Sequence, residues 1–379
     1  LNGFPIDAPI EAEVQWAWEF PWYNGGITLT DADGTDYPTQ IITEECVVPS
    51  FRSRFVFRAE IPAGGYKCFI VRQTEKSEAS SRRFKLGKAA YGGFDLIDTQ
   101  SGKTLKGIFL PYVRVDECDT WGFNKTVLET ERQELSLKSF GVIEDGLFRT
   151  AYKAVYAYNK STLTLLFRVY DDRVLCEYRC LWNEERRTLK LGFNSGSCVS
   201  SIPFGFIRRE ISEYEMPMAQ WIEGDGFSLG TSSAFSYDYD GKQIGITLLR
   251  NAPLDTSREY TYMGQGETTG VIQMCFDNGK HAAAALNNPP VIIAEANHGG
   301  IFPPQKSFFK CDGAYLSAVK KSERNGDTIL RIVEENGENT VAGVTIGDYK
   351  FSVPLKPFEI RTIAFDGSKI HKVNMLEEQ

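Results

Sequence analysis

The chain has 379 residues, of which 42% are hydrophobic and 24% charged, and its formal net charge is −8. This length exceeds what one hydrophobic core usually organises, so we expect two or three globular domains. Basic residues are scattered rather than clustered, and no apolar run approaches the roughly 20 residues that span a bilayer, so we expect no nucleic-acid partner and no membrane partner.

The chain begins Leu1-Asn2-Gly3-Phe4-Pro5, without an initiator methionine or the features of a signal peptide. We interpret it as a piece of a longer protein, the alternative being that a tag or initiator residue was removed. Its eight cysteines include no C-x-x-C pair, and several lie in apolar, strand-like surroundings. This usage is typical of reduced, buried thiols, so we expect a cytoplasmic location.

Short β runs that end at turn residues dominate the chain. Examples are Ile27–Leu29 before an Asp-Ala-Asp-Gly turn, Leu163–Val169 before two aspartates, and Ile244–Leu249 after Asp-Gly. Helical periodicity is almost absent, and the best helical candidate, Thr126–Lys138, also alternates as a strand would. Strands spaced at roughly 8–12 residues with such turns are typical of sandwiches, so we predict an all-β fold.

Two breaks divide the pattern into three predicted domains. Residues 1–75 form a small β-sandwich, and the polar run Glu75–Arg83 then reads as a linker. Residues 84–285 form a long series of strands. A second break at Asn287-Asn288-Pro289-Pro290 leads to a last sandwich, 286–368, and we expect the tail beyond Phe365 to fray.

No motif in the chain supports a metal site or a catalytic site. The three histidines, His281, His298 and His371, are far apart and offer no metal-ligand spacing. No nucleophile elbow, P-loop or dinucleotide fingerprint is present. We therefore predict no catalytic residue, no metal ligand and no cofactor within this segment.

The densest acidic constellation follows the predicted strand Leu110–Val115. It comprises Asp116, Asp119 and Trp121, and carboxylates beside an exposed indole suit contact with a sugar. The alternative is a solvated loop whose tryptophan folds into the core. Trp16 and Trp18 alternate on one strand face, where they suit packing against a neighbouring domain or, alternatively, a sugar platform.

The run Ile202–Arg209, followed by Glu215–Pro217 and Gln220–Ile222, resembles the C-terminal region of glycoside hydrolase family 38 α-mannosidases. The resemblance continues through Phe235–Gly241 and Thr247–Pro253. Segments in the expected order on either side extend it to most of residues 85–365. They are Glu144–Arg149, Leu181–Glu184, Leu189–Leu191, Leu286–Pro289, Ser307–Phe309, Ser317–Glu323, Ile329–Arg331 and Pro357–Thr362.

The resemblance implies a β-sandwich, a large super-sandwich like that of galactose mutarotases, and a C-terminal β-sandwich. It further implies a retaining α-mannosidase whose catalytic carboxylates and zinc ligands lie in an N-terminal domain outside this chain. The expected partners are that catalytic domain and a mannose-containing oligosaccharide. Arg250 falls near an arginine that reaches the substrate pocket in some relatives, the alternative being a surface ion pair. The run that follows, Met263–Thr268, lacks the Asp and His of many relatives.

Three hypotheses follow for the function of this segment. The first is a structural part of an α-mannosidase, inactive alone, that supports the catalytic domain and helps border the mannoside site. The second is a free-standing carbohydrate-binding module, suggested by Trp121 and Trp221. The third is an oligomerisation scaffold, which would make the protein a homo-oligomer.

Overall fold

A computed structural model describes residues 6–15, 26–42, 52–75, 82–122, 125–212, 214–255, 257–259, 262–276 and 279–378. The chain divides into two compact units. The first contains residues 1–79, 203–206 and 288–379, and the second contains residues 80–202 and 207–287. The predicted block 1–75 and all of 286–368 except residues 286 and 287 thus fall in the first unit, and most of 84–285 falls in the second. Strands make up most of the described residues, which confirms the all-β fold class.

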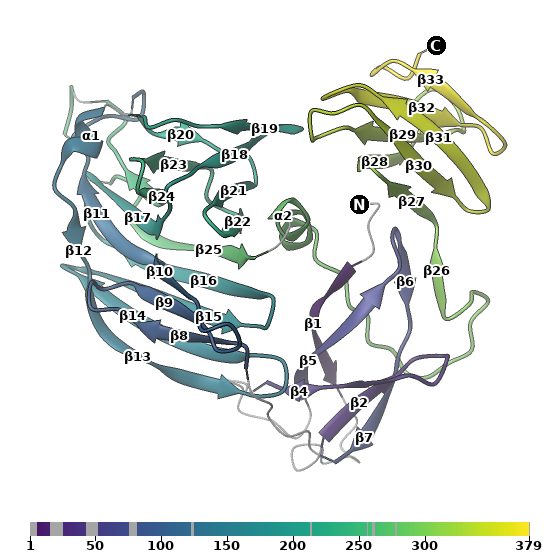
Figure 1. Cartoon of the computed structure of the whole chain (residues 1–379), viewed down its shortest axis with the longest axis horizontal. Helices are drawn as coiled ribbons and strands as arrows, with labels where there is room; N and C mark the ends of the chain where they lie inside the picture. Colours follow the sequence, from purple (N-terminus) through teal and green to yellow (C-terminus); the bar gives the residue numbers. More distant parts are fainter. Residues whose placement is uncertain are drawn as a thin grey trace. The chain divides into compact units, whose positions relative to one another are not determined.

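The second unit is built around a nine-stranded sheet whose consecutive neighbours from β13 to β18 run antiparallel (Figure 1). In spatial order its strands are β13 (Ser136–Asp145), β14 (Thr150–Tyr158), β15 (Ser161–Val169), β16 (Arg173–Trp182), β25 (Gly266–Cys275), β22 (Phe227–Thr231), β21 (Trp221–Gly224), β18 (Val199–Ile202) and β19 (Gly205–Arg208).

A six-stranded and a three-stranded sheet complete this unit. The six strands are β12 (Gln133–Glu134), β11 (Leu110–Val115), β17 (Arg187–Asn194), β24 (Gln243–Asn251), β23 (Ser236–Tyr239) and β20 (Met216–Pro217). The three strands are β10 (Thr104–Ile108), β9 (Phe94–Asp98) and β8 (Phe84–Lys88). One large hydrophobic cluster draws residues from all three sheets, so they share a single core.

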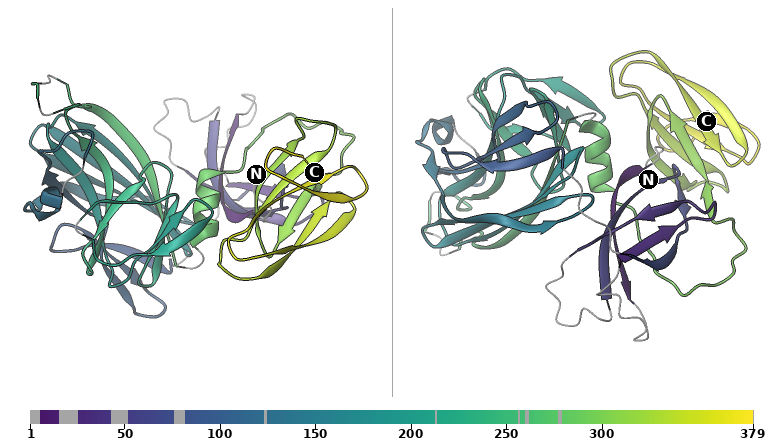
Figure 2. Two further views of the ribbon diagram at one scale, coloured as in Figure 1. Left: turned by 90° about the horizontal axis from the view of Figure 1, so that it is seen from above. Right: turned by 60° about the horizontal axis from the view of Figure 1, so that its bottom comes forward.

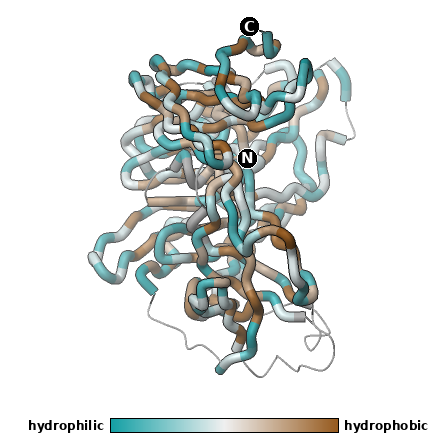
Figure 3. The backbone as a smooth tube through the Cα atoms, turned by 90° about the vertical axis from the view of Figure 1, so that its right-hand side faces the viewer, coloured by the Kyte–Doolittle hydropathy of each residue, from teal (hydrophilic) through white to brown (hydrophobic). Residues whose placement is uncertain are grey.

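Alternation along the strands explains how this core forms. In β15, Leu163, Leu165 and Phe167 are buried while the intervening residues are more exposed, because successive side chains point to opposite faces. Figure 3 colours the chain by hydropathy, and hydrophobic and hydrophilic stretches are interspersed along the tube. Asn159, with φ of 44°, begins the two-residue turn between β14 and β15, where the left-handed conformation suits the twist of a hairpin.

The unit contains two short helices, α1 (Lys125–Glu129) and α2 (Gly279–Asn287). α2 packs on β22, where a Cβ added to Gly230 would lie 3.0 Å from the Cα of Ala283. Helices are thus almost absent from the described residues, as expected, although the sequence analysis did not select α2. Among the described residues, no helix is long and apolar enough to cross a membrane.

The first unit contains two small sandwiches. In the N-terminal one, one sheet comprises β1 (Ile6–Gln15), β5 (Arg52–Ile61) and β4 (Gln40–Ile41), and the other comprises β3 (Asp36–Pro38), β2 (Gly26–Thr30) and β7 (Ile70–Thr74). In the C-terminal one, one sheet comprises β27 (Phe309–Asp312), β30 (Thr340–Ile346) and β31 (Tyr349–Leu355), and the other comprises β28 (Tyr315–Lys321), β29 (Thr328–Val333), β32 (Ile360–Phe365) and β33 (Ile370–Val373). The C-terminal strands, yellow in both views of Figure 2, enclose a hydrophobic cluster of their own.

A two-stranded ladder joins the two small sandwiches, β6 (Gly65–Lys67) pairing with β26 (Gln305–Ser307) (Figure 1). A Cβ at Gly65 would lie 1.9 Å from the carbonyl oxygen of Lys306, so only glycine allows this approach. The ladder is extended by hydrogen bonds from the Cys68 amide to Pro304 O and from the Tyr66 hydroxyl to Pro303 O. Sandwiches far apart in sequence are thereby tied through main-chain hydrogen bonds.

The C-terminal tail is ordered, which corrects the expectation that it frays. β33 pairs with β32 beyond Phe365, and Glu377 then accepts hydrogen bonds from Ser322 Oγ, at 3.0 Å, and from the Glu323 amide, at 2.7 Å. Lys320 Nζ lies 2.9 Å from the same carboxylate. Glu378 adds a contact with Arg324 Nη2 at 2.7 Å, so two acidic residues near the end of the tail attach it to the sandwich.

Candidate functional site

The residues predicted to contact a sugar gather at one end of the six-stranded sheet. The C-terminal end of β11 pairs with the start of β17, because Val115 faces Arg187, and the start of β17 pairs with the end of β24, because Thr188 faces Arg250. The loop after β11, residues 116–122, and the segment after β24 therefore leave the sheet at the same edge. This register brings Asp116 and Arg250 together although they are 134 residues apart.

Asp116 is the buried centre of this arrangement, with 0% of its surface exposed. Its carboxylate accepts hydrogen bonds from Arg250 Nε at 2.5 Å, from Thr188 Oγ1 at 3.0 Å and from the Cys118 amide at 3.0 Å. A buried carboxylate is tolerated only when hydrogen bonds and a counter-charge replace water, and both are present here. Asp116 therefore anchors the loop rather than facing solvent.

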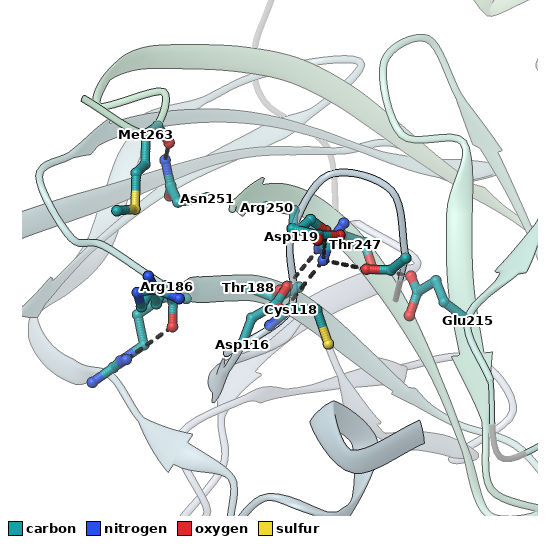
Figure 4. A network of polar contacts seen from close by, with 12 residues as sticks. Asp116, Cys118, Asp119, Arg186, Thr188, Glu215, Thr247, Arg250, Asn251 and Met263 are labelled. Carbon is teal, nitrogen blue, oxygen red and sulfur yellow. Dashed lines mark hydrogen bonds and ion pairs between the residues drawn. The ribbon is translucent and has the colours of Figure 1, made fainter. Parts of the chain in front are cut away.

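Arg250 uses its guanidinium group to hold the same loop. Besides the ion pair with Asp116, its Nη2 donates to the carbonyl oxygens of Asp119 and Gly122, each at 2.8 Å (Figure 4). Its side chain is 22% exposed. A β-bulge directs it to this side, because the register of β24 shifts by one residue between Thr247 and Leu249. The interaction is thus a largely buried ion pair with two backbone contacts, and not the surface ion pair that was the alternative.

Trp121 lies at the far end of the loop and points into solvent, 83% exposed. Its amide donates to Asp119 Oδ1 at 3.0 Å, so the Asp119 side chain supports the loop from within. Thr120 ties the loop to the segment after β24 through its amide, which donates to Pro253 O, and its hydroxyl, which donates to Leu254 O. The alternative in which this tryptophan folds into the core is therefore wrong.

The other tryptophan that suggested sugar binding, Trp221, is buried in β21. Trp16 and Trp18 lie outside the described residues. Of the aromatic side chains considered from the sequence, Trp121 alone is shown at the surface of the part that the structure describes.

Sequence reasoning missed a second polar network on the same sheet, centred on Lys190. This lysine lies in β17 with 0% exposure, and its Nζ is 2.6 Å from Asp238 Oδ1 and 2.8 Å from Glu215 Oε2. It also donates to Thr247 Oγ1 at 2.7 Å. Lys190 stands between Leu189 and Leu191, and that alternation would suggest a solvent-facing residue, so the sequence carries little signal of its burial.

The charges around Lys190 decide its chemistry. Burial alone would lower the pKa of Lys190, but Glu215 and Asp238 outweigh it and raise that pKa above the ordinary range. Burial, together with the charge of Asp238, also raises the pKa of Tyr112. A lysine acts as a nucleophile only when its pKa is lowered, so this ammonium group stays protonated and acts as a structural cation.

The described residues contain no group of three or more histidine, cysteine or acidic side chains that could hold a metal ion. His371 Nε2 lies 3.0 Å from Asp366 Oδ2, and His298 Nδ1 lies 3.0 Å from Gly299 O. Five of the seven described cysteines are buried. Burial raises the pKa of the Cys180 thiol to about 12, which suppresses the reactive thiolate. The donors that zinc requires are not assembled in this part of the chain.

Comparison with known proteins gives matches to solved structures only. No family model matches the sequence, and no curated protein does. A crystal structure of a protein in glycosyl hydrolase family 38 from Enterococcus faecalis matches with a TM-score of 0.72 and 12% identity, over 96% of this chain and 57% of that chain. An α-mannosidase from the same species matches with a TM-score of 0.75 and 13% identity, over 96% and 55% respectively.

These matches establish the fold of the chain. The fold is similar to a part of the two Enterococcus faecalis proteins, and the similarity includes both compact units because 96% of this chain is covered. The chain spans little more than half the length of either solved protein.

Proposed function

We propose that this chain is the C-terminal, non-catalytic β region of a retaining α-mannosidase similar to those of glycoside hydrolase family 38. The observation that carries this proposal is the asymmetry of the structural match, which takes in 96% of this chain but only 55–57% of the solved proteins. The region would support a catalytic domain encoded outside this sequence. That domain would supply the catalytic carboxylates and zinc.

The loop of residues 116–122 is the part of the described chain that we propose borders the mannoside site. Its tryptophan is exposed, and the Asp116–Arg250 pair and three further hydrogen bonds hold the backbone around it. An indole face packs against the apolar C–H face of a pyranose, and a fixed loop presents that face without a further entropy cost on binding. The sugar would be a mannose-containing oligosaccharide.

The test compares this chain with the full product of the reading frame that encodes it. Each is assayed for hydrolysis of 4-nitrophenyl α-mannoside, with added zinc and with a chelator. We expect zinc-dependent turnover by the full product and none by this chain, shown to be folded by its circular dichroism. Turnover by this chain alone, abolished by the chelator, would overturn the proposal.

A free-standing carbohydrate-binding module is the second candidate, because Trp121 is 83% exposed. If the chain is such a module, it should bind manno-oligosaccharides, and the full product of its reading frame should show no mannosidase activity. Calorimetric titration of the chain with mannobiose, set beside the hydrolysis assay, separates the two candidates. Light scattering of the same sample tests whether the chain is a homo-oligomer, as an assembly scaffold would require.

A further inference from the structure

The segment that connects α2 to β26 is exposed along almost its whole length. Every residue from 291 to 304 is exposed, and the chain forms neither helix nor strand there, as the green trace between α2 and β26 shows (Figure 1). No main-chain hydrogen bond joins residues 291–302 to another residue that the structure describes. The segment therefore belongs to none of the sheets of the described chain.

The side chains of this segment are not those of a solvated linker. Val291, Ile293 and Ile301 are 86%, 77% and 93% exposed, and Ile292 and Phe302 are exposed as well. Flexible linkers are rich in glycine, serine and charged residues, because such residues need no apolar partner. Five large apolar side chains kept in water within one short segment are instead typical of a surface that packs against a partner.

Proline pairs keep both ends of the segment extended. Pro289 and Pro290 precede residues 291–302, and Pro303 and Pro304 follow them. Proline fixes its own φ at about −65° and disfavours the helical conformation of the residue before it. The chain therefore enters and leaves the segment in an extended conformation, which presents its side chains outward.

Hydrogen bonds hold the chain on either side of these prolines. The side-chain amide of Asn287, the last residue of α2, donates to the carbonyl oxygen of Thr231 at 3.1 Å. At the other end, the carbonyl oxygens of Pro303 and Pro304 accept hydrogen bonds from the Tyr66 hydroxyl and from β6 beyond its last residue. A segment whose ends are held loses less conformational entropy on binding than a free one, so this segment is prepared for a partner.

The size of the segment indicates which partner it suits. A stable complex between separate proteins needs about 20–30 residues on each side, which is more than residues 291–302 provide. A domain of the same polypeptide meets the segment at a high effective concentration, so a smaller contact is enough. Of the two solved proteins, 57% and 55% are matched, so more than two-fifths of each has no counterpart in this chain. These observations favour a further domain of the same polypeptide over a second copy of this chain.

We propose that residues 291–302 are a docking segment for the catalytic domain encoded outside this sequence, and that their five large apolar side chains are buried against an apolar surface of that domain. The inference rests on the proposed function, because that function names the domain. It deepens the proposed function by locating in the chain a contact through which the β region supports its partner.

The experiment is cleavage by thermolysin, a protease that cuts before large apolar residues in exposed, extended chains. It compares this chain with the full product of the reading frame, and cuts within residues 291–302 are identified by fragment mass. In this chain, cleavage there should be fast and independent of protein concentration. In the full product it should be at least about tenfold slower, because the protease acts only on the undocked state.

A double variant tests whether the apolar side chains carry the contact. In the full product, Val291→Asp with Phe302→Asp should speed cleavage about tenfold, because docking would bury two unpaired charges. In this chain the same pair should leave the urea midpoint unchanged, because both side chains are exposed. Each variant's rate in the full product is divided by its rate in this chain, so that changes in the preference of the protease cancel.

The control is Leu376→Asp, which changes another exposed apolar residue and should leave this ratio at the parent value. Phe302→Asp alone gives the same comparison if the full product of the double variant does not fold.

Two results would overturn the inference. Equal cleavage rates in the two parent proteins would mean that the segment stays uncovered in the full product. Cleavage of this chain that slows as its concentration rises would assign the segment to a second copy of the chain. Neither result depends on hydrolysis: a full product that cleaves 4-nitrophenyl α-mannoside, and is cut within residues 291–302 as fast as this chain, would refute the docking segment and leave the proposed function standing.

Discussion

Two charged networks lie on the same sheet, and they differ in what they hold. Lys190 is enclosed inside the unit, where it contacts Glu215, Asp238 and Thr247, all of them largely removed from solvent. Arg250 is partly exposed and reaches the backbone of a surface loop. Each network pairs a cation with acidic side chains. The Lys190 network stabilises the interior of the unit, whereas the Arg250 network holds the 116–122 loop at the surface.

The more deeply a charged group is buried, the more the free energy of unfolding should fall when its partner is removed. A buried ion stranded without its partner carries the full desolvation cost, whereas an exposed ion regains water. The following predictions test that ranking, from the fully enclosed network to an exposed pair.

The largest effect is expected at Lys190. Lys190→Met strands Glu215 and Asp238 as buried carboxylates, so the free energy of unfolding should fall by about 3–5 kcal/mol. Urea unfolding followed by circular dichroism measures the change. Adding Glu215→Gln and Asp238→Asn to the same variant removes the stranded charges and should restore part of the loss. A loss below about 1 kcal/mol in the single variant would contradict the structural role assigned to this lysine.

Asp116 should give a smaller loss. Asp116→Ala removes the counter-charge of Arg250 and four hydrogen bonds to the carboxylate. Arg250 is 22% exposed and can turn to water, so we expect a loss of about 1–3 kcal/mol. Urea unfolding measures it, with Glu117→Ala as the matched control on the same loop, expected to change stability by less than about 0.5 kcal/mol. Equal losses in the two variants would show that the buried carboxylate has no special role.

Glu377 tests the network that attaches the C-terminal tail. Its hydrogen bond with Lys320, followed by that with the Glu323 amide, lowers the pKa of Glu377 to about 2. A lowered pKa means that its stabilisation is present above the ordinary glutamate pKa and is lost as pH falls through the folded value. Glu377→Gln should therefore lower the urea midpoint at pH 7, and its difference from the parent should shrink between pH ~4 and pH ~2. Glu378→Gln is the control, and a difference independent of pH would exclude this account.

The smallest effect is expected at an exposed pair on the nine-stranded sheet. Arg179 Nη2 lies 2.7 Å from Glu267 Oε2, and both side chains are exposed. Arg179→Gln should change the free energy of unfolding by less than about 0.5 kcal/mol, because solvent and salt screen such pairs. Unfolding at low and high sodium chloride checks this, and a loss comparable to that of Lys190→Met would break the ranking.

Much of the strand pattern could be predicted from the sequence because it depends on local alternation. The expected strand Leu110–Val115 matches β11, Leu163–Val169 lies within β15, and Ile244–Leu249 lies within β24. Helix α2 was not selected from the sequence, although its run of alanines is a strong helix signal. The three-domain division and the cytoplasmic location remain predictions.

The site was predictable only in part. The acidic-aromatic turn drew attention to Asp116, Asp119 and Trp121, but which of them is buried depends on strands far along the chain. Asp116 is enclosed because β17 and β24 bring Thr188 and Arg250 to it. The contact from Asn251 to Met263 is likewise not a sequence pattern. Tertiary register, which no local signal encodes, decides these roles.

The ladder between β6 and β26 has a consequence for biosynthesis. Tyr66 and its acceptor Pro303 are 237 residues apart. At roughly 5–20 residues per second, a ribosome needs about 12–47 s to make the chain between them. During that interval the edge of β6 has no partner strand, and unpaired edges promote association between chains. The nascent protein therefore passes through a period in which chaperones that shield strand edges should improve its yield.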